Sequence, residues 1–222
     1  YTCNYEKMCR VEGNNKIPSA TVLSFDIEVN STNPQRMPNA KLAGDKIFQI
    51  SCVLGKTDEK EPAEKIIITM GKVNPDLLDK GTRAIECDNE GDVLLNYTKV
   101  VREYNPQIIT GYNIFSFDIP YMIERSRHTN VYYDFVIQGY TDAIAEEKEI
   151  KWSSTAYKNQ CFKYLDAHGR LYVDMLPLVQ RDYKLNNYKL KTVSDMFVGE
   201  TKDPLTARDI FKCYRMGIKM LS

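Results

Sequence analysis

The first regular pattern along the chain is the alternating stretch ATVLSFDIEV, at residues 20–29. Its odd-numbered positions from 23 to 29 are all apolar, whereas Asp26 and Glu28 occupy even-numbered positions. Alternation with a period of two is typical of a strand that buries one face. The pattern therefore predicts a strand whose two acidic side chains lie together on the face away from the core.

Two more apolar runs follow and predict further strands. They are KIFQISCVLG at 46–55 and EKIIITMG at 64–71, and each ends at a glycine. Because the three runs are close in sequence, we expect them to pair as an antiparallel meander.

The next segments alternate between helix and strand. Residues 90–104 carry apolar side chains at helical spacing, with Asp88 or Asn89 available as the N-cap and Asn-Pro after the end. QIITGY at 107–112 predicts a short strand, and 118–128 predicts a helix that tolerates Pro120 in its first turn. A helix between two strands favours a parallel crossover.

This element order is that of a ribonuclease H-like α/β fold, a mixed sheet flanked by helices. In such a fold the strand at 107–112 lies beside the first strand, so we expect Asp118 to emerge near Asp26 and Glu28.

The second half of the chain predicts an inserted β-hairpin and then helices. We expect hairpin strands near 148–154, 158–166 and 169–173, and helices at 174–183, 189–199 and 204–217. In the hairpin sequence, basic side chains alternate with aromatic ones, and a hairpin that is simply exposed to solvent would carry the same pattern. No repeat or linker divides the chain.

Composition narrows the class of protein. The 222 residues include 30 basic and 30 acidic side chains, so a polyanion would have to be bound by locally placed charge. The six cysteines form no CxxC pair and lie in no zinc-like spacing with the two histidines, which favours reduced thiols in an intracellular protein. No apolar run reaches the roughly 18 residues that span a bilayer, so we expect no membrane partner.

The acidic residues suggest a chemistry. Asp26 and Glu28 on one face, joined by Asp118 from a neighbouring strand end, would supply oxygen ligands for two hard cations, Mg²⁺ or Mn²⁺. Two such ions suit hydrolysis of a phosphodiester. Simpler interpretations stay open, because Asp-x-Glu occurs on solvated strand faces and Asp118 could be a helix cap.

Three motifs in order resemble a known family. FDIE at 25–28, GYNIFSFD at 111–118 and GRLYVDMLPLVQRDYKLNNYKLKTVSDMFVGETKD at 169–203 are similar to the 3′ to 5′ proofreading exonuclease domain of family B DNA polymerases. The resemblance runs from about residue 20 to the end. The general character of the sequence, rather than any single motif, favours a polymerase of a large DNA virus.

The resemblance implies roles for individual residues. Asp26, Glu28 and Asp118 would be catalytic metal ligands, with Asp26 bridging the ions. Asn113 and Phe117 would touch the terminal nucleotide, and Phe25 could also pack against it, since aromatic stacking binds an unpaired base without reading its sequence. Core packing explains each aromatic residue equally well.

The chain departs from the family at the third motif, a Tyr followed four residues later by Asp. No tyrosine here has Asp at that spacing. We therefore expect an N-terminal flank at 1–19 and an exonuclease domain at 20–222 that stops before this motif, with weak or no activity in isolation. Asp174 could replace the missing acid, but its place between a strand and a helix favours an N-cap, and Asp209 is expected to be solvated.

The resemblance also implies the wider setting. It predicts proofreading within a DNA-directed DNA polymerase during DNA replication, with a single-stranded 3′ end or primer-template as substrate. The partners would be the polymerase domains of the same chain and a processivity factor, in the nucleus or at a viral replication site. Two alternatives stay open: a nuclease-inactive DNA-binding or scaffold module, and a free-standing DEDD-type nuclease.

Overall fold

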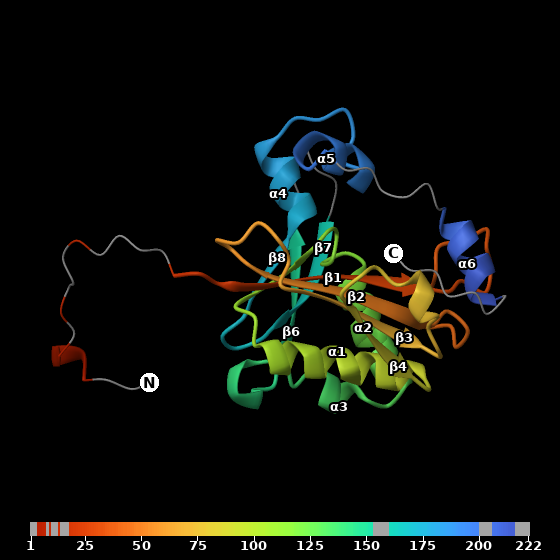
Figure 1. Ribbon diagram of the computed structural model, residues 1–222, viewed down its shortest axis with the longest axis horizontal. Coiled ribbons are helices and arrows are strands. Elements are labelled where there is room, and N and C mark those ends of the chain that lie inside the picture. The colour runs from red at the N-terminus through yellow and green to blue at the C-terminus, as the bar shows by residue number, and fades with distance from the viewer. Residues whose placement is uncertain are drawn as a thin grey trace.

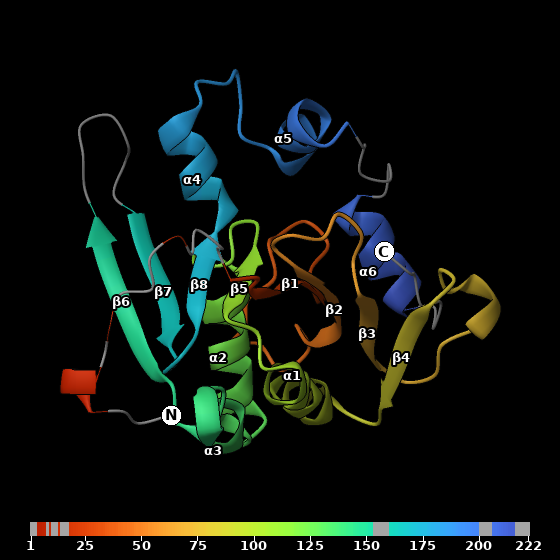
Figure 2. The same cartoon turned by 60° about the vertical axis from the view of Figure 1, so that its left-hand side comes forward.

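The computed structural model describes residues 4–7, 9, 13, 18–152, 160–199 and 206–215. Its centre is a six-stranded mixed sheet with the strand order β4-β3-β2-β1-β5-β8, and β6 and β7 form a separate two-stranded sheet (Figures 1 and 2). The strands are β1 (Thr21–Val29), β2 (Ile47–Lys56), β3 (Glu64–Met70), β4 (Thr82–Cys87), β5 (Ile108–Gly111), β6 (Glu146–Trp152), β7 (Gln160–Asp166) and β8 (Leu171–Asp174).

Helices cover both faces of the main sheet. In Figure 1, α1, α2 and α3 lie below the sheet, and α4 and α5 lie above it. The α-helices are α1 (Glu90–Tyr104), α2 (Asp118–His128), α3 (Tyr132–Phe135), α4 (Met175–Asp182), α5 (Leu190–Phe197) and α6 (Ala207–Arg215), and the 3-10 turns are η1 (Tyr5–Lys7), η2 (Pro75–Leu77) and η3 (Tyr140–Asp142). This is the expected ribonuclease H-like arrangement, with the hairpin inserted between α3 and β8.

The predicted pairing of the first strands is confirmed. β1 pairs antiparallel with β2, and β2 pairs antiparallel with β3, as a meander requires. β5 lies parallel to β1 on its other side, in the register Val22↔Ile108 to Ser24↔Thr110. The crossover helix α1 has Asn89 as its N-cap, and the Asn89 side chain accepts a hydrogen bond from the Asp92 N–H.

Two sequence expectations about strands are wrong or incomplete. The strand near 169–173 does not join the hairpin; as β8 it pairs parallel with β5, from Ile108↔Leu171 to Gly111↔Asp174. Its closeness in sequence to β7 is misleading, because Gly169 at φ +76° turns the chain away between them. The pattern also missed β4, a short edge strand parallel to β3 that carries charged side chains and little alternation.

The rest of the second half follows the prediction. β6 and β7 pair antiparallel from Glu146↔Asp166 to Trp152↔Gln160, and the expected hairpin residues 153–159 lie outside the described ranges. The ends of the helix expected at 204–217 also lie outside them.

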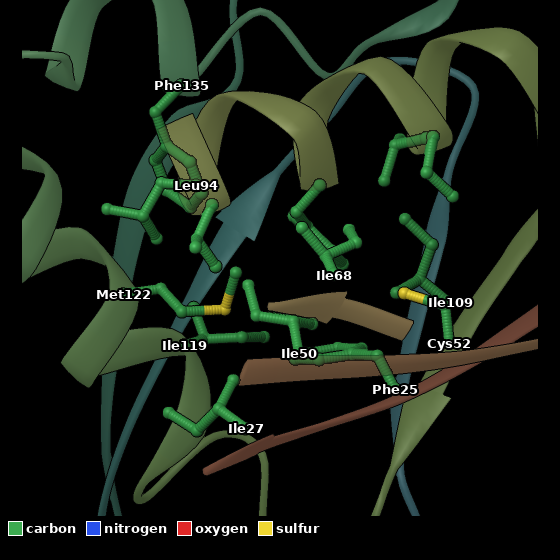
Figure 3. Close-up of a cluster of buried hydrophobic side chains, with 14 of the residues drawn as sticks. Phe25, Ile27, Ile50, Cys52, Ile68, Leu94, Ile109, Ile119, Met122 and Phe135 are labelled. Carbon is green, nitrogen blue, oxygen red and sulfur yellow. The ribbon is translucent and has the colours of Figure 1, made fainter. Parts of the chain in front are cut away.

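The core fills the space between the sheet and helices α1 and α2. Figure 3 shows the inward side chains of β1, β2 and β3 meeting those of the helices, among them Phe25, Ile50, Leu94 and Met122. Leu23, Phe25, Ile27 and Val29 are all buried, as the alternation predicts. Each such side chain contributes roughly 1.5–3 kcal/mol by leaving water, so the core fixes which face of β1 the acids occupy.

Two smaller findings concern cysteines and membranes. Cys9, Cys52, Cys87 and Cys161 are free thiols, which agrees with the reduced state expected from their spacing. Within the described ranges, no helix combines the length and apolar character that crossing a bilayer requires.

Candidate active site

The first two predicted ligands lie where the strand pattern places them. Asp26 is exposed and Glu28 is partly exposed, on the face of β1 opposite the core. Across β1, Asp26 is paired in register with Ser51 and Glu28 with Gln49 of β2. Asp26 and Glu28 therefore project from a strand that is hydrogen-bonded to β2, and the core on the opposite face fixes the position of this strand.

The end of β5 leaves one edge of β1 open. The β1–β5 ladder stops at Ser24↔Thr110, and the chain then turns through Gly111. A Cβ at Gly111 would lie 2.5 Å from Ile114 Cγ2 and 2.7 Å from the Phe25 carbonyl oxygen, so only glycine fits this close approach. Beyond it, Asn113 takes a left-handed conformation with φ 66°, and the chain reverses into α2.

Asp118 occupies the edge that β5 leaves. It is 2% exposed at the start of α2, and its Oδ1 accepts a hydrogen bond of 3.2 Å from the Ile27 N–H. The carboxylate thus replaces the strand that would otherwise satisfy this donor. This contact places Asp118 near Asp26, as predicted, because Ile27 is the next residue after Asp26.

Burial and charge act together on this carboxyl group. Burial, and to a smaller extent the nearby negative charge of Asp26, together raise the pKa of Asp118 to about 8, against the lowering effect of the Ile27 N–H. Asp174 adds a smaller repulsion. A cation placed between Asp26 and Asp118 would relieve this repulsion.

Asp174 is the N-cap that its position predicted, and it has a second structural role. Its Oδ1 accepts from the Leu176 N–H at 3.0 Å, which caps α4. The same carboxylate accepts from the Asn113 N–H at 2.8 Å and the Phe115 N–H at 2.9 Å. Asp174 therefore fixes the loop that leads to Asp118, although burial raises its pKa. No local pattern around Asp174 predicts these bonds, because they depend on β8 lying beside β5.

The predicted nucleotide-contacting residues lie in different surroundings. Phe117 is partly exposed, packs its ring 5.5 Å from that of Tyr121, and lines a cavity with Asp26 and Glu28. Asn113 is partly exposed in the loop before α2. Phe25 is 3% exposed and packs against Tyr97 at 5.2 Å, on the face of β1 opposite Asp26, so core packing accounts for its ring.

The loop between β1 and β2 forms one wall of that cavity, and the buried Asp45 organises it. Its Oδ1 accepts from the N–H and the hydroxyl of Thr32 at 2.7 and 2.6 Å, and its Oδ2 accepts from the Asn39 N–H at 2.8 Å. The Tyr121 hydroxyl donates to the Asp45 carbonyl oxygen at 2.8 Å. These bonds connect the wall directly to α2.

A buried ion pair fixes the other end of the loop. Arg125 of α2 donates from Nε and Nη2 to the Glu90 carboxylate at 2.7 and 2.5 Å. Its Nη1 donates to the carbonyl oxygens of Ala40 and Leu42 at 3.0 and 2.8 Å, and Glu90 also accepts from the Ile47 N–H. Sequence reasoning missed this pair, whose members are 35 residues apart.

The cavity has a volume of about 470 Å³ and joins four parts of the chain. They are the acidic end of β1, the β1–β2 loop, Phe117 at the N-cap of α2, and α6. The side chains that line it include Asp26, Glu28, Phe117, Arg36, Met37 and Arg208. A cavity of this size falls in the range of small-ligand sites.

The hairpin contacts the loop that precedes α2. The Lys163 N–H of β7 donates to the Phe115 carbonyl oxygen at 2.9 Å, and the Phe115 ring lies 5.7 Å from that of Tyr164. The two-stranded sheet therefore borders the candidate site through Phe115.

The donor chemistry suits a divalent metal, although the ligands do not converge tightly. Carboxylate oxygens are the ligands that Mg²⁺ and Mn²⁺ prefer. Among the residues that the structure describes, no group of three or more Asp, Glu, His or Cys side chains is close enough to hold a metal ion. Asp209, the other acid considered, is exposed and accepts from Thr206 at the start of α6.

Comparison with known proteins is consistent with this geometry. Residues 1–193 match the family described as "DNA polymerase family B, exonuclease domain". The chain is 46% identical over 205 residues to DNA polymerase 120R of Invertebrate iridescent virus 3, which covers 91% of this chain and 18% of that protein. It is 32% identical over 189 residues to the DNA polymerase delta catalytic subunit of Candida albicans, covering 85% of this chain and 18% of that protein. The chain thus spans less than a fifth of these relatives.

Proposed function

The chain belongs to the exonuclease domains of family B DNA polymerases, and we propose that it removes mismatched nucleotides from the 3′ end of DNA within such a polymerase. Its substrate is a single-stranded 3′ end, delivered from the primer-template. The other polymerase domains and a processivity factor are its partners, and it works where DNA is replicated, in the nucleus or at a viral replication site.

The observation that carries the proposal is the position of Asp118. A buried carboxylate with a raised pKa lies at the open edge of β1, within electrostatic reach of Asp26. The ionised form of such a carboxyl group is costly to the fold unless a cation binds there. The family relationship indicates that the reaction served by such a cation site is hydrolysis of the 3′ nucleotide.

Asp26, Glu28 and Asp118 are the residues that would hold Mg²⁺ or Mn²⁺. When bound, such ions supply a nucleophilic hydroxide at neutral pH and stabilise the oxygens of the reacting phosphodiester. The chain itself orients Asp118 through the Ile27 N–H, and it places Phe117 beside the carboxylates, where its ring can pack against a terminal base. Asn113 is the further nucleotide contact of this proposal.

We place the exonuclease domain at residues 20–222 and its flank at 1–19. The family's third motif, which supplies a fourth acid, has no counterpart among these residues, because no tyrosine is followed by Asp four positions later. Without that ligand, the isolated chain should cut DNA weakly or not at all.

The test compares degradation of a labelled single-stranded 3′ end in Mn²⁺ by this chain and by the longer polymerase that we propose contains it. Asp118→Ala should reduce cleavage by the longer polypeptide at least about 100-fold, since even outer-sphere changes at metal sites cost about 10- to 100-fold. Asp134→Ala is the matched control, because Asp134 is exposed on α3.

Each other outcome changes the proposal. Unchanged cleavage in Asp118→Ala would refute the assigned site. Full activity of the isolated chain that still depends on Asp118 would place the fourth ligand within these residues and favour a free-standing nuclease. A folded longer polypeptide without cleavage would favour a DNA-binding module whose site has decayed.

A further inference from the structure

Most arginine side chains in the described part of the chain already have an anionic or carbonyl partner. Arg170 donates to the carbonyl oxygens of Pro106 and Gln138. Carboxylate partners hold the others: Arg83 with Glu64 and Glu103, Arg102 with Asp142, Arg125 with Glu90, Arg127 with Glu147, and Arg181 with Asp182.

Arg36 and Arg208 differ from these arginines. Both are exposed, and neither forms an ion pair with an acidic side chain in the ranges that the structure describes. They come from the β1–β2 loop and from α6, 172 positions apart by their numbers, yet both line the cavity that contains Asp26 and Glu28. Arg208 Nη2 donates to Gln35 Oε1 at 3.0 Å, which connects α6 to the loop and orients the guanidinium.

The charge of the cavity suggests a role for two guanidinium groups that have no acidic partner in the described ranges and lie beside two carboxylates. The chain carries 30 basic and 30 acidic residues, so it offers no general attraction for a polyanion. Asp26 and Glu28 repel a phosphate unless cations offset their charge, and guanidinium groups in the same cavity add positive charge beside them. Guanidinium groups suit this role because their planar donors match phosphate oxygens.

We propose that Arg36 and Arg208 bind the phosphate group of the nucleotide that occupies this cavity. The proposal rests on the function proposed above and adds substrate-binding residues to it. The cavity volume of about 470 Å³ is large enough for a small ligand, and Phe117 supplies an aromatic surface in the same cavity. The phosphate can belong to the terminal nucleotide of a strand or to a released mononucleotide.

The test is a titration of this chain with thymidine 5′-monophosphate and with thymidine in Mg²⁺, followed by NMR. The wild-type chain should bind the monophosphate more tightly than the nucleoside. Arg36→Gln and Arg208→Gln should each weaken binding of the monophosphate roughly tenfold, as expected for loss of a hydrogen bond between charged groups. Binding of thymidine should not change.

Two controls make the result specific. Arg181→Gln removes the same charge from α4, where Arg181 is already paired with Asp182, and it should bind the monophosphate like the wild type. Arg36→Lys and Arg208→Lys should recover part of the affinity, because charge returns without the planar donors. All replaced side chains are exposed, and thermal unfolding would verify that each variant is folded.

The outcomes separate this proposal from the proposed function. If Arg36→Gln and Arg208→Gln bind the monophosphate no more weakly than Arg181→Gln, or if the wild type does not prefer it to thymidine, the phosphate site is refuted even where Asp118-dependent cleavage is found. If the variants lose affinity but no cleavage occurs in the longer polypeptide, the phosphate site stands and the nuclease function falls. Titration with a short DNA strand shows whether the site also holds a terminal nucleotide.

Discussion

Two buried aspartates sit at comparable places in this fold, and their surroundings differ. Asp118 begins α2 after β5, and Asp174 ends β8 before α4; they are 2% and 3% exposed. Asp174 accepts from the backbone N–H groups of Asn113, Phe115 and Leu176. Asp118 accepts from the Ile27 N–H and faces the charge of Asp26.

The difference teaches how to distinguish a structural from a functional buried acid. Burial is nearly equal, so burial alone says nothing about role. At Asp174, three donors compensate the carboxylate, which suits a permanent part of the scaffold. At Asp118, a neighbouring negative charge adds to the cost of ionisation, and that cost is offset either by a bound proton or by a cation from outside the chain.

A third buried carboxylate, Glu90, is balanced more fully than the two aspartates, because the positive charge of Arg125 offsets its negative charge. Replacing Arg125 by Met would leave Glu90 buried and unpaired and would release the carbonyl oxygens of Ala40 and Leu42. We expect the free energy of unfolding to fall by about 3–5 kcal/mol, measured by urea denaturation.

Arg181→Met is the control for that change, since its ion pair is exposed and worth at most about 1 kcal/mol. A loss of similar size in both variants would show that the Arg125–Glu90 pair does not anchor the loop. Adding Glu90→Leu to Arg125→Met should recover part of the loss.

Replacing Asp174 by Ala tests the structural member of the comparison. The change removes the acceptor for three backbone N–H groups, and we expect a loss of about 2–4 kcal/mol in the free energy of unfolding. Asp209→Ala removes an exposed interaction at the start of α6 and should cost about 1 kcal/mol or less. Equal losses in urea denaturation would contradict the role given to Asp174.

Replacing Asp118 by Asn tests the other member through pH. The pKa of Asp118 rises from its ordinary value of 3.8 to about 8 in the folded chain, so the folded state holds this proton more tightly than the unfolded state. That contribution to stability is complete below about pH 4 and is lost as the pH rises through about 8. Asn keeps an oxygen that accepts from Ile27 and carries no charge.

We therefore expect Asp118→Asn to raise the free energy of unfolding by up to about 4 kcal/mol more at pH 9 than at pH 5, in EDTA, because the wild type loses about 1.4 kcal/mol per pH unit between pH 5 and pH 8. Asp134→Asn, on the exposed surface of α3, should show no such dependence. A constant difference between Asp118→Asn and the wild type from pH 5 to pH 9 would show that Asp118 ionises normally.

Local pattern predicted the elements that carry the site. The alternation in β1 placed Asp26 and Glu28 on one face, and the helical spacing of 90–104 and 118–128 gave α1 and α2 with their bounds. These predictions succeed because burial of one face imposes a period on neighbouring residues. The strand at 169–173 was assigned to the wrong sheet because pairing with β5 leaves no mark in its own sequence.

The sequence by itself determined the order of elements, the two acids of β1 and the resemblance that identifies the family. Only the tertiary structure decided that Asp118 replaces a strand partner for Ile27, that Asp174 anchors the loop at 113–115, and that Arg36 and Arg208 share a cavity. Periodicity records how each residue relates to its near neighbours. Electrostatic balance at a buried site depends instead on groups that are tens of residues away and meet only when the sheet is assembled.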